Sequence, residues 1–164
     1  MLGRGAGEGR NVVDAMELRD MRRCLADIAA DGRVRSMRRF IQHGRVSTYR
    51  HCACVALLSY RLNRRLRLGA DLDTLLKGAM LHDFYLYDWH KNGDGFPRWH
   101  GFHHPDRAAE NAANYLHVNA GVQHVIRCHM WPLTLRCIPR TREAWIVCLA
   151  DKWASLRETL FRRR

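Results

Sequence analysis

The sequence contains no uncharged run approaching the ~20 residues that a membrane-spanning helix needs. Its N-terminus also lacks the apolar segment that a secretory signal carries before its cleavage site. No two of the 6 cysteines form a Cys-x-x-Cys pair, which argues against a zinc-ribbon or thioredoxin-type site. Together these absences predict a cytoplasmic protein with no membrane partner and with reduced thiols.

Lysine is scarce, and acidic residues are outnumbered. The 28 basic residues include only three lysines, Lys77, Lys91 and Lys152, and they face 16 acidic residues, which gives a formal net charge of +12. The arginines are scattered apart from the short run at 162–164, and no helical pattern shows a basic stripe interleaved with aromatic residues. A nucleic-acid partner is therefore not expected, and the basic surface suits an anionic, phosphorylated small molecule.

Alternating strand patterns of useful length are missing too, whereas apolar residues recur at helical spacing. The expected fold is all-α, a compact bundle of about six to seven helices. Residues 1–10, rich in glycine, predict a disordered leader, and residues 11–164 predict a single domain. The expected helices cover about 11–30, 34–42, 47–66, 71–84, 105–116, 120–130 and 141–160, with a loop containing Gly and Pro at 87–103.

Three of these helices begin at residues that favour a helix start. Ser47 or Thr48 is placed to cap one helix, Asp71 begins the next, and Pro105 suits a first helical turn. The first expected helix can pack against a second copy of the chain as readily as against its own core. A homodimer is therefore one expectation for the assembly.

Histidine is abundant, and several of the 10 histidines fall where apolar residues are expected. His51, Asp83, His129 and Asp151 each continue an apolar stripe, so four expected helices each direct one ionisable group toward the core. Burying four such groups separately would cost several kcal/mol for each unpaired charge. A divalent metal removes that cost because it favours ionised carboxylates and neutral imidazoles. The placement therefore predicts a metal centre.

Two further histidines complete the candidate ligand set, since His82 precedes Asp83 and His104 precedes Pro105. The full set comprises His51, His82, Asp83, His104, His129 and Asp151. Mixed nitrogen and oxygen ligands in that number suit one or two divalent transition-metal ions of Mn, Fe, Co, Ni or Zn, with Mg as an alternative. His117 and His124 fall off the apolar stripes and are expected at the surface.

The order His51, His82-Asp83 and Asp151 resembles the signature of the HD-domain superfamily of metal-dependent phosphohydrolases. Five segments look like those of a small stand-alone bacterial subfamily of HDIG-type proteins: IQHGRVSTYRHC, LLKGAMLHDFYLYDWH, HGFHHPDRAAENA, IRCHMWPLT and LADKWAS. The resemblance covers about residues 34–158 and implies a compact HD-domain bundle. It also implies that these four residues bind one metal ion.

The same resemblance implies how a second metal ion would be held. Members with two metals add a His from a His-Pro motif and a His on a later helix, which His104-Pro105 and His129 match, and the Asp83 carboxylate bridges the two ions. The chain departs from the cyclic-dinucleotide branch, because it has no Gly-Tyr-Pro loop. Tyr85 replaces the Lys that often follows the His-Asp pair.

The resemblance implies hydrolysis of a phosphate ester, by a phosphomonoesterase or phosphodiesterase acting on a nucleotide or a similar small molecule. Asp83 is then both ligand and catalytic bridge, and Asp88 is a candidate proton donor or partner of a ligating histidine. The candidate substrate-binding residues are Lys152, Arg127, His100 and His103. HD-fold oxygenases, including myo-inositol oxygenase, use the same ligand order around two irons, so a di-iron oxygenase stays open as the alternative.

Overall fold

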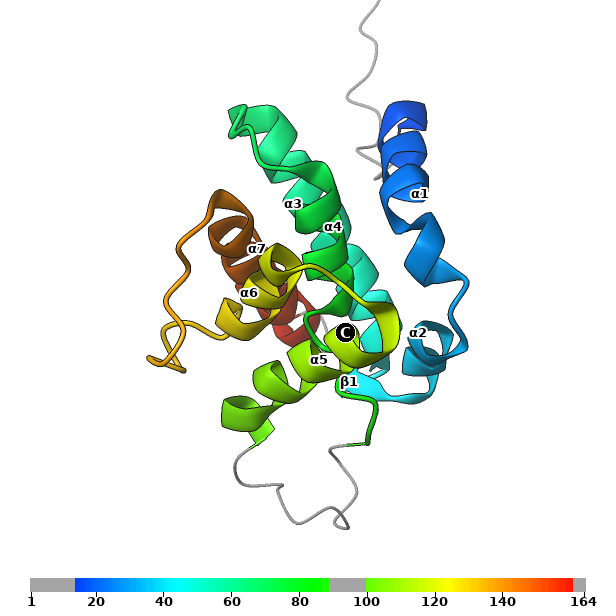
Figure 1. Ribbon diagram of the computed structural model, residues 1–164, viewed down its shortest axis with the longest axis vertical. Helices are drawn as coiled ribbons and strands as arrows, with labels where there is room; N and C mark the ends of the chain where they lie inside the picture. The colour runs from blue at the N-terminus through cyan, green and yellow to red at the C-terminus, as the bar shows by residue number, and fades with distance from the viewer. Residues whose placement is uncertain (1–13, 89–99, 161–164) are drawn as a thin grey trace, which may run out of the picture.

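The computed structural model describes residues 14–88 and 100–160 (Figure 1). Over these residues it contains seven α-helices, one short 3-10 helix and one two-stranded hairpin, which confirms the all-α expectation. The elements are α1 (Ala15–Ala29), α2 (Gly32–Ser36), η1 (Met37–Arg39), β1 (Ile41–His43), β2 (Val46–Ser47), α3 (Thr48–Leu66), α4 (Leu72–Leu81), α5 (His100–Leu116), α6 (Ala120–Cys128) and α7 (Arg142–Leu160). The expected leader at 1–10 lies outside the described residues.

Side-chain caps set where several helices begin. Ser47 accepts a hydrogen bond from the backbone N–H of Arg50 and caps α3, and Asp71 accepts one from Thr74 and caps α4. Each cap satisfies a backbone donor that has no partner inside the helix, which is why Ser and Asp are favoured there. Both starts agree with the sequence prediction.

The segment predicted as a helix at 34–42 folds differently. Its first half forms α2 and η1, but Ile41–His43 pairs with Val46–Ser47 as an antiparallel hairpin. Gly44 turns the chain with a φ of 62°, a backbone conformation that glycine adopts without strain. The hairpin is too short to show an alternating pattern, so the expectation of a continuous helix was wrong here.

Helix α5 begins earlier than predicted. It starts at His100, and Pro105 therefore lies inside the helix, so the placement of Pro105 in the first turn was wrong. Proline has no backbone N–H, so at this position it forgoes one hydrogen bond to the preceding turn. Most of the predicted loop at 87–103 lies outside the described residues.

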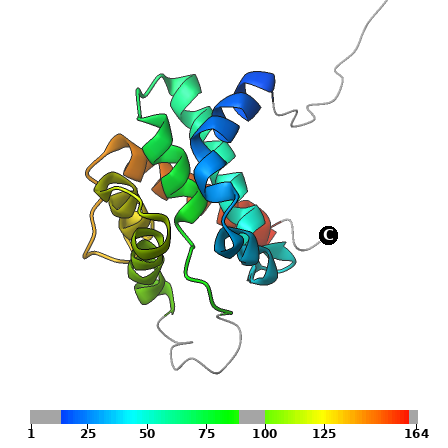
Figure 2. The ribbon, with the colours of Figure 1, turned by 45° about the vertical axis from the view of Figure 1, so that its right-hand side comes forward.

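The helices pack around α3 and α4, which run side by side at the centre of the bundle (Figure 1). Helix α7 packs against α3, α4 and α6, and α5 pairs with α6. Figure 2 shows α1 lying along the other side of α3 and α4. None of the helices in the described ranges combines the length and apolar character that crossing a membrane requires.

Two of the six cysteines are joined, contrary to the expectation of reduced thiols. Cys128, the last residue of α6, forms a disulfide with Cys137 in the segment that leads to α7. The chain folds back after α6 and brings the two sulfur atoms together, which a separation of 9 residues without a Cys-x-x-Cys pattern does not indicate. Cys24, Cys52, Cys54 and Cys148 are free.

Helix α4 approaches α6 closely at Gly78. A Cβ atom at this position would lie 2.5 Å from Cγ1 and 2.8 Å from Cβ of Val125. Gly78→Ala is therefore expected to destabilise the protein by about 1–3 kcal/mol, because overpacking outweighs the roughly 1 kcal/mol gain in helix propensity. The free energy of unfolding from urea titration measures this loss.

Gly32 provides the matched control, because a Cβ there would have no atom within 4 Å. Gly32→Ala is expected to change stability by no more than about 1 kcal/mol, and in the stabilising direction. Adding Val125→Ala to Gly78→Ala should recover part of the loss, since it removes the clashing methyl groups. Equal stability of the two single alanine variants would contradict this account of the α4–α6 contact.

Candidate metal centre

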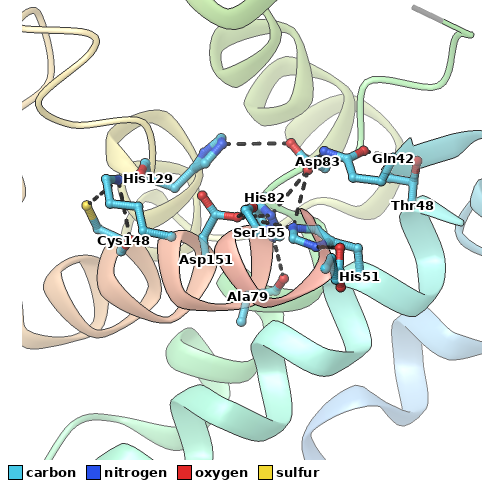
Figure 3. A network of polar contacts seen from close by, with 12 residues as sticks. Gln42, Thr48, His51, Ala79, His82, Asp83, His129, Cys148, Asp151 and Ser155 are labelled. Carbon is cyan, nitrogen blue, oxygen red and sulfur yellow. Dashed lines mark hydrogen bonds and ion pairs between the residues drawn. The ribbon is translucent and has the colours of Figure 1, made fainter. Parts of the chain in front are cut away.

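The six predicted ligands come together from five parts of the fold. His51 lies in α3, His82 and Asp83 directly follow α4, His104 lies in α5, His129 directly follows α6, and Asp151 lies in α7. None of the six is more than 7% exposed. Figure 3 labels five of them, His51, His82, Asp83, His129 and Asp151, which converge on one region between the helices. The structure thus brings the whole predicted set into a single buried cluster.

His82 and His129 occupy the same place at the ends of two different helices. Each is the C-cap residue of its helix, and each Nδ1 donates a hydrogen bond to the backbone carbonyl three residues earlier: His82 to Ala79 over 2.8 Å, and His129 to Ile126 over 2.6 Å. A carbonyl can only accept, so the shared proton lies on Nδ1 in both rings. This contact leaves each Nε2 directed into the cluster as a potential ligand atom.

His51 is held by carboxylates at both ring nitrogens. Its Nδ1 lies 3.0 Å from Oε2 of Glu158, and its Nε2 lies 3.1 Å from Oδ1 of Asp151. Burial by itself would lower the pKa of His51, but these two hydrogen bonds outweigh it and raise the pKa to about 10. Glu158 was missed in the sequence, although its spacing of seven residues from Asp151 places both on one face of α7.

The two oxygens of Asp83 face different pairs of imidazoles. Oδ1 lies 3.2 Å from Nε2 of His104 and 3.7 Å from Nε2 of His129. Oδ2 lies 3.3 Å from Nε2 of His82 and 3.9 Å from Nε2 of His51. One carboxylate therefore stands between two separate groups of nitrogen atoms, which is the arrangement a bridging ligand requires.

A chain of hydrogen bonds from the hairpin orients Asp83. Nε2 of Gln42 donates to Oδ2 of Asp83 over 2.6 Å (Figure 3). The orientation of the Gln42 amide is fixed because the hydroxyl of Tyr85 donates to its Oε1 over 2.6 Å. The Thr48 hydroxyl lies 3.3 Å from the same oxygen. The hairpin, which the sequence pattern does not indicate, thus positions the central carboxylate, and Tyr85 supports it through Gln42.

The ionisable groups of the cluster shift one another's pKa values. Burial opposes the charged form of Asp83, but the imidazoles of His82 and His104 hold its pKa well below the usual value. Burial likewise opposes ionisation of Asp151, but the hydrogen bond from His51 and the nearby imidazole of His82 lower its pKa. Both carboxylates are therefore ionised, and Asp83 raises the pKa of His82 well above the usual value against the effect of burial.

His129 behaves in the opposite way. Burial, together with the nearby His82 and His104, lowers the pKa of His129 to about 3. Its imidazole is therefore neutral, with Nδ1 protonated by its contact with Ile126 and Nε2 carrying a lone pair 3.0 Å from Nε2 of His104. A neutral imidazole with a free Nε2 is the form that binds a metal ion.

Two atoms at the centre lack ordinary partners. Among the described residues, Nε2 of His82 and Oδ1 of Asp83 are buried and make no hydrogen bond of normal geometry. Such atoms are costly unless something else coordinates them. Three overlapping groups of potential ligand atoms surround them, each with all atoms within 4.8 Å of one another: His51, His82 and Asp151; Asp83, His104 and His129; and Cys52, His82 and Asp83. This donor set fits divalent transition metals.

Comparison with known proteins agrees with this geometry. A family model described as the HD domain matches residues 48–156, about two thirds of the chain. The chain belongs to the HD-domain family. No curated protein and no solved structure matches it. Family membership indicates metal-dependent, hydrolase-type chemistry, and all six clustered residues lie inside the matched range.

The residues that support the ligands lie partly outside the matched HD domain. Gln42 precedes the first matched residue, Thr48, and Glu158 follows the last, Leu156. Gln42 nevertheless donates to Asp83 over 2.6 Å, and Glu158 accepts from His51 over 3.0 Å. Both supporting residues therefore lie outside the range that the family model matches.

The predicted substrate-binding residues are found in different surroundings. Nζ of Lys152 donates to the backbone carbonyl of His129 over 3.0 Å, so it supports a candidate ligand. Nε of Arg127 lies 3.8 Å from Oδ1 of Asp106. Asp88 is half-buried, and the side chain of His100 lies outside the described part of the chain. Any role of these residues toward a substrate stays a prediction.

Arg127 and His103 share a pocket of about 450 Å³ between α5 and the segment after α6. It is lined by Phe102, His103, Pro105, Asp106, Arg127, Leu133, Thr134, Leu135, Arg136 and Cys137. At 100° per residue, Phe102, His103 and Asp106 lie on one face of α5 and His104 on the opposite face. The pocket therefore lies on the side of α5 that is opposite to His104 and the other candidate ligands.

Proposed function

We propose that this protein is a phosphohydrolase that depends on two divalent transition-metal ions. The observation that carries the proposal is the position of Asp83, whose two oxygens face separate pairs of imidazole Nε2 atoms. A buried carboxylate in this position is better placed to bridge two cations than to pair with one. Family membership supports the same chemistry.

The donor set divides into two sites that share Asp83. His51, His82 and Asp151 would hold one ion together with Oδ2 of Asp83. His104 and His129 would hold the other together with Oδ1. Four imidazole nitrogens favour Mn, Fe, Co, Ni or Zn, whereas Mg prefers oxygen ligands throughout.

Metal ions held in this way supply a bound water of lowered pKa and a Lewis acid for phosphoryl oxygens. The protein supplies orientation: Gln42 fixes Asp83, Glu158 fixes His51, and Lys152 holds the backbone carbonyl of His129. Asp88, five residues beyond Asp83, is the candidate proton donor to the leaving group. The formal net charge of +12 favours the approach of an anionic, phosphorylated small molecule.

The proposal is tested by assaying metal-loaded protein for phosphate release from an aryl phosphate, nucleoside mono- and triphosphates and cyclic dinucleotides. Each metal, Mn, Fe, Co, Ni, Zn and Mg, is added to protein that a chelator has stripped. We expect activity to disappear on stripping and to return with at least one transition metal, at a content of two ions per chain. Full activity of stripped protein, or oxygen uptake without phosphate release from iron-loaded protein, would overturn it.

A further inference from the structure

Helix α7 is apolar on two opposite faces. Its inner face buries Ala144, Val147 and Ala154 alongside Asp151. Its outer face carries five large apolar side chains that are between 37% and 61% exposed: Trp145, Leu149, Trp153, Leu156 and Leu160. A helix at the surface of a monomer normally presents polar residues to solvent, so the outer face needs an explanation.

The five side chains form a narrow, continuous stripe. Their spacings of four, four, three and four residues keep them within about 80° of arc at 100° per residue. Large aromatic and aliphatic side chains at these exposures present roughly 500–600 Å² of surface, which is as large as the biggest apolar patch on a typical monomer. Two such stripes facing each other would remove about 1,000–1,200 Å² from water, the lower end of the range for specific interfaces.

The spacing of the five residues indicates which partner would cover the stripe. Read from either end, the stripe has nearly the same spacing, because Trp145 and Leu160 lie equally far from its midpoint, and so do Leu149 and Leu156. Two antiparallel copies of α7 would therefore place Trp145 against the partner's Leu160, with Trp153 beside the two-fold axis. Spacings of three and four residues are also those with which two helices pack along a seam. This self-complementarity is the property of a two-fold symmetric interface.

We propose that the chain forms a two-fold symmetric homodimer through the outer face of α7. Trp153 lies at the centre of the interface, where aromatic side chains contribute most to association. The alternative of dimerisation through α1 is less favourable, because its exposed large apolar residues within the described range are only Met16 and Leu18. The proposal holds whether or not the metal centre is a phosphohydrolase.

The dimer would also affect the metal centre. Leu156 and Leu160 lie on either side of Glu158 in the last two turns of α7, and Glu158 holds Nδ1 of His51. Helix ends open easily when nothing packs on them. Contact with the partner's α7 would therefore keep Glu158 in place behind His51.

Sedimentation equilibrium on the full chain tests the proposal. Wild-type protein should give twice the 19.2 kDa chain mass over a micromolar concentration range. Trp153→Glu would bring two carboxylates together at the axis and should weaken association at least about 100-fold. Leu66→Glu, at an equally exposed leucine on α3, is the matched control and should leave the dimer intact. Circular dichroism checks that each variant is folded.

Ionic strength and a milder variant keep the test decisive. The copies carry +12 each, so the dimer should tighten as salt increases, whereas an assembly bridged by a contaminating polyanion would fall apart. If Trp153→Glu does not fold, Leu149→Ala should still weaken association measurably. A wild-type monomer throughout the concentration range, or a dimer that Leu66→Glu disrupts as strongly as Trp153→Glu, would overturn the proposal.

Discussion

Asp83→Asn is expected to remove both metal ions from the protein and to abolish hydrolysis. The Asp83 carboxylate is the one group that faces both sets of imidazoles among the described residues, so its loss affects both sites together. Asparagine has the same shape but carries no charge and presents only one acceptor oxygen. We expect metal affinity to fall by more than the roughly 10–100-fold that is typical when an outer hydrogen-bond partner of a metal ligand is lost.

The comparison with His129→Ala separates a shared ligand from an unshared one. His129 belongs to one group of ligand atoms only, so its removal should leave one ion per chain where Asp83→Asn leaves none. His117→Asn changes an exposed histidine with a φ of 51°, which asparagine tolerates, and should keep both ions. Elemental analysis of gently purified protein measures the metal content. Equal metal loss in Asp83→Asn and His129→Ala would contradict a bridging role for Asp83.

The ligands in the middle of helices could be predicted from their neighbours. His51 in α3 and Asp151 in α7 each continue the apolar stripe of their helix, and a polar residue on such a stripe is expected to be buried. Glu158 could have been found in the same way, because it lies two turns beyond Asp151. Glutamate is seldom buried, so the residue type by itself does not indicate this contact.

The ligands at helix ends were predicted for a different reason from the one the structure gives. His82, Asp83 and His129 were assigned to the last turns of their helices, but α4 ends at Leu81 and α6 at Cys128. The backbone carbonyls near a helix end have no partner within the helix, and the imidazoles of His82 and His129 supply one. The same side chains that terminate the helices are thereby oriented as candidate ligands.

The role of Gln42 could not be predicted from sequence. Its amide reaches Asp83 across 41 residues of chain only because the hairpin of residues 41–47 turns back before α3. Such a contact depends on tertiary packing and not on any local spacing. The role of Tyr85 could not be predicted either. Its place after the His-Asp pair suggested only a departure from the family pattern, but in the structure its hydroxyl fixes the Gln42 amide.

Glu158→Ala is expected to weaken metal binding at the site formed by His51, His82 and Asp151 by about 10–100-fold. Glu158 accepts the hydrogen bond from Nδ1 of His51 and so keeps Nε2 available as the ligand atom. Glu158→Gln should have a smaller effect, because its amide oxygen still accepts this bond although the charge is lost. Glu110→Ala, which removes an exposed glutamate on α5, is the control. Titration with a transition metal, followed by elemental analysis, measures the change.

The titration of His51 distinguishes this positioning role from a general loss of packing. In metal-free protein the raised pKa of His51, about 10 against an ordinary 6.5, means that its imidazolium stabilises the fold. That stabilisation is complete below about pH 6.5 and is lost as the pH rises through about 10. Without Glu158 one of the two hydrogen bonds that raise the pKa is gone, so the loss should begin at lower pH in Glu158→Ala than in wild type. Unfolding midpoints of metal-free protein between pH 6 and 10 measure it, and parallel curves for the two proteins would assign Glu158 to packing alone.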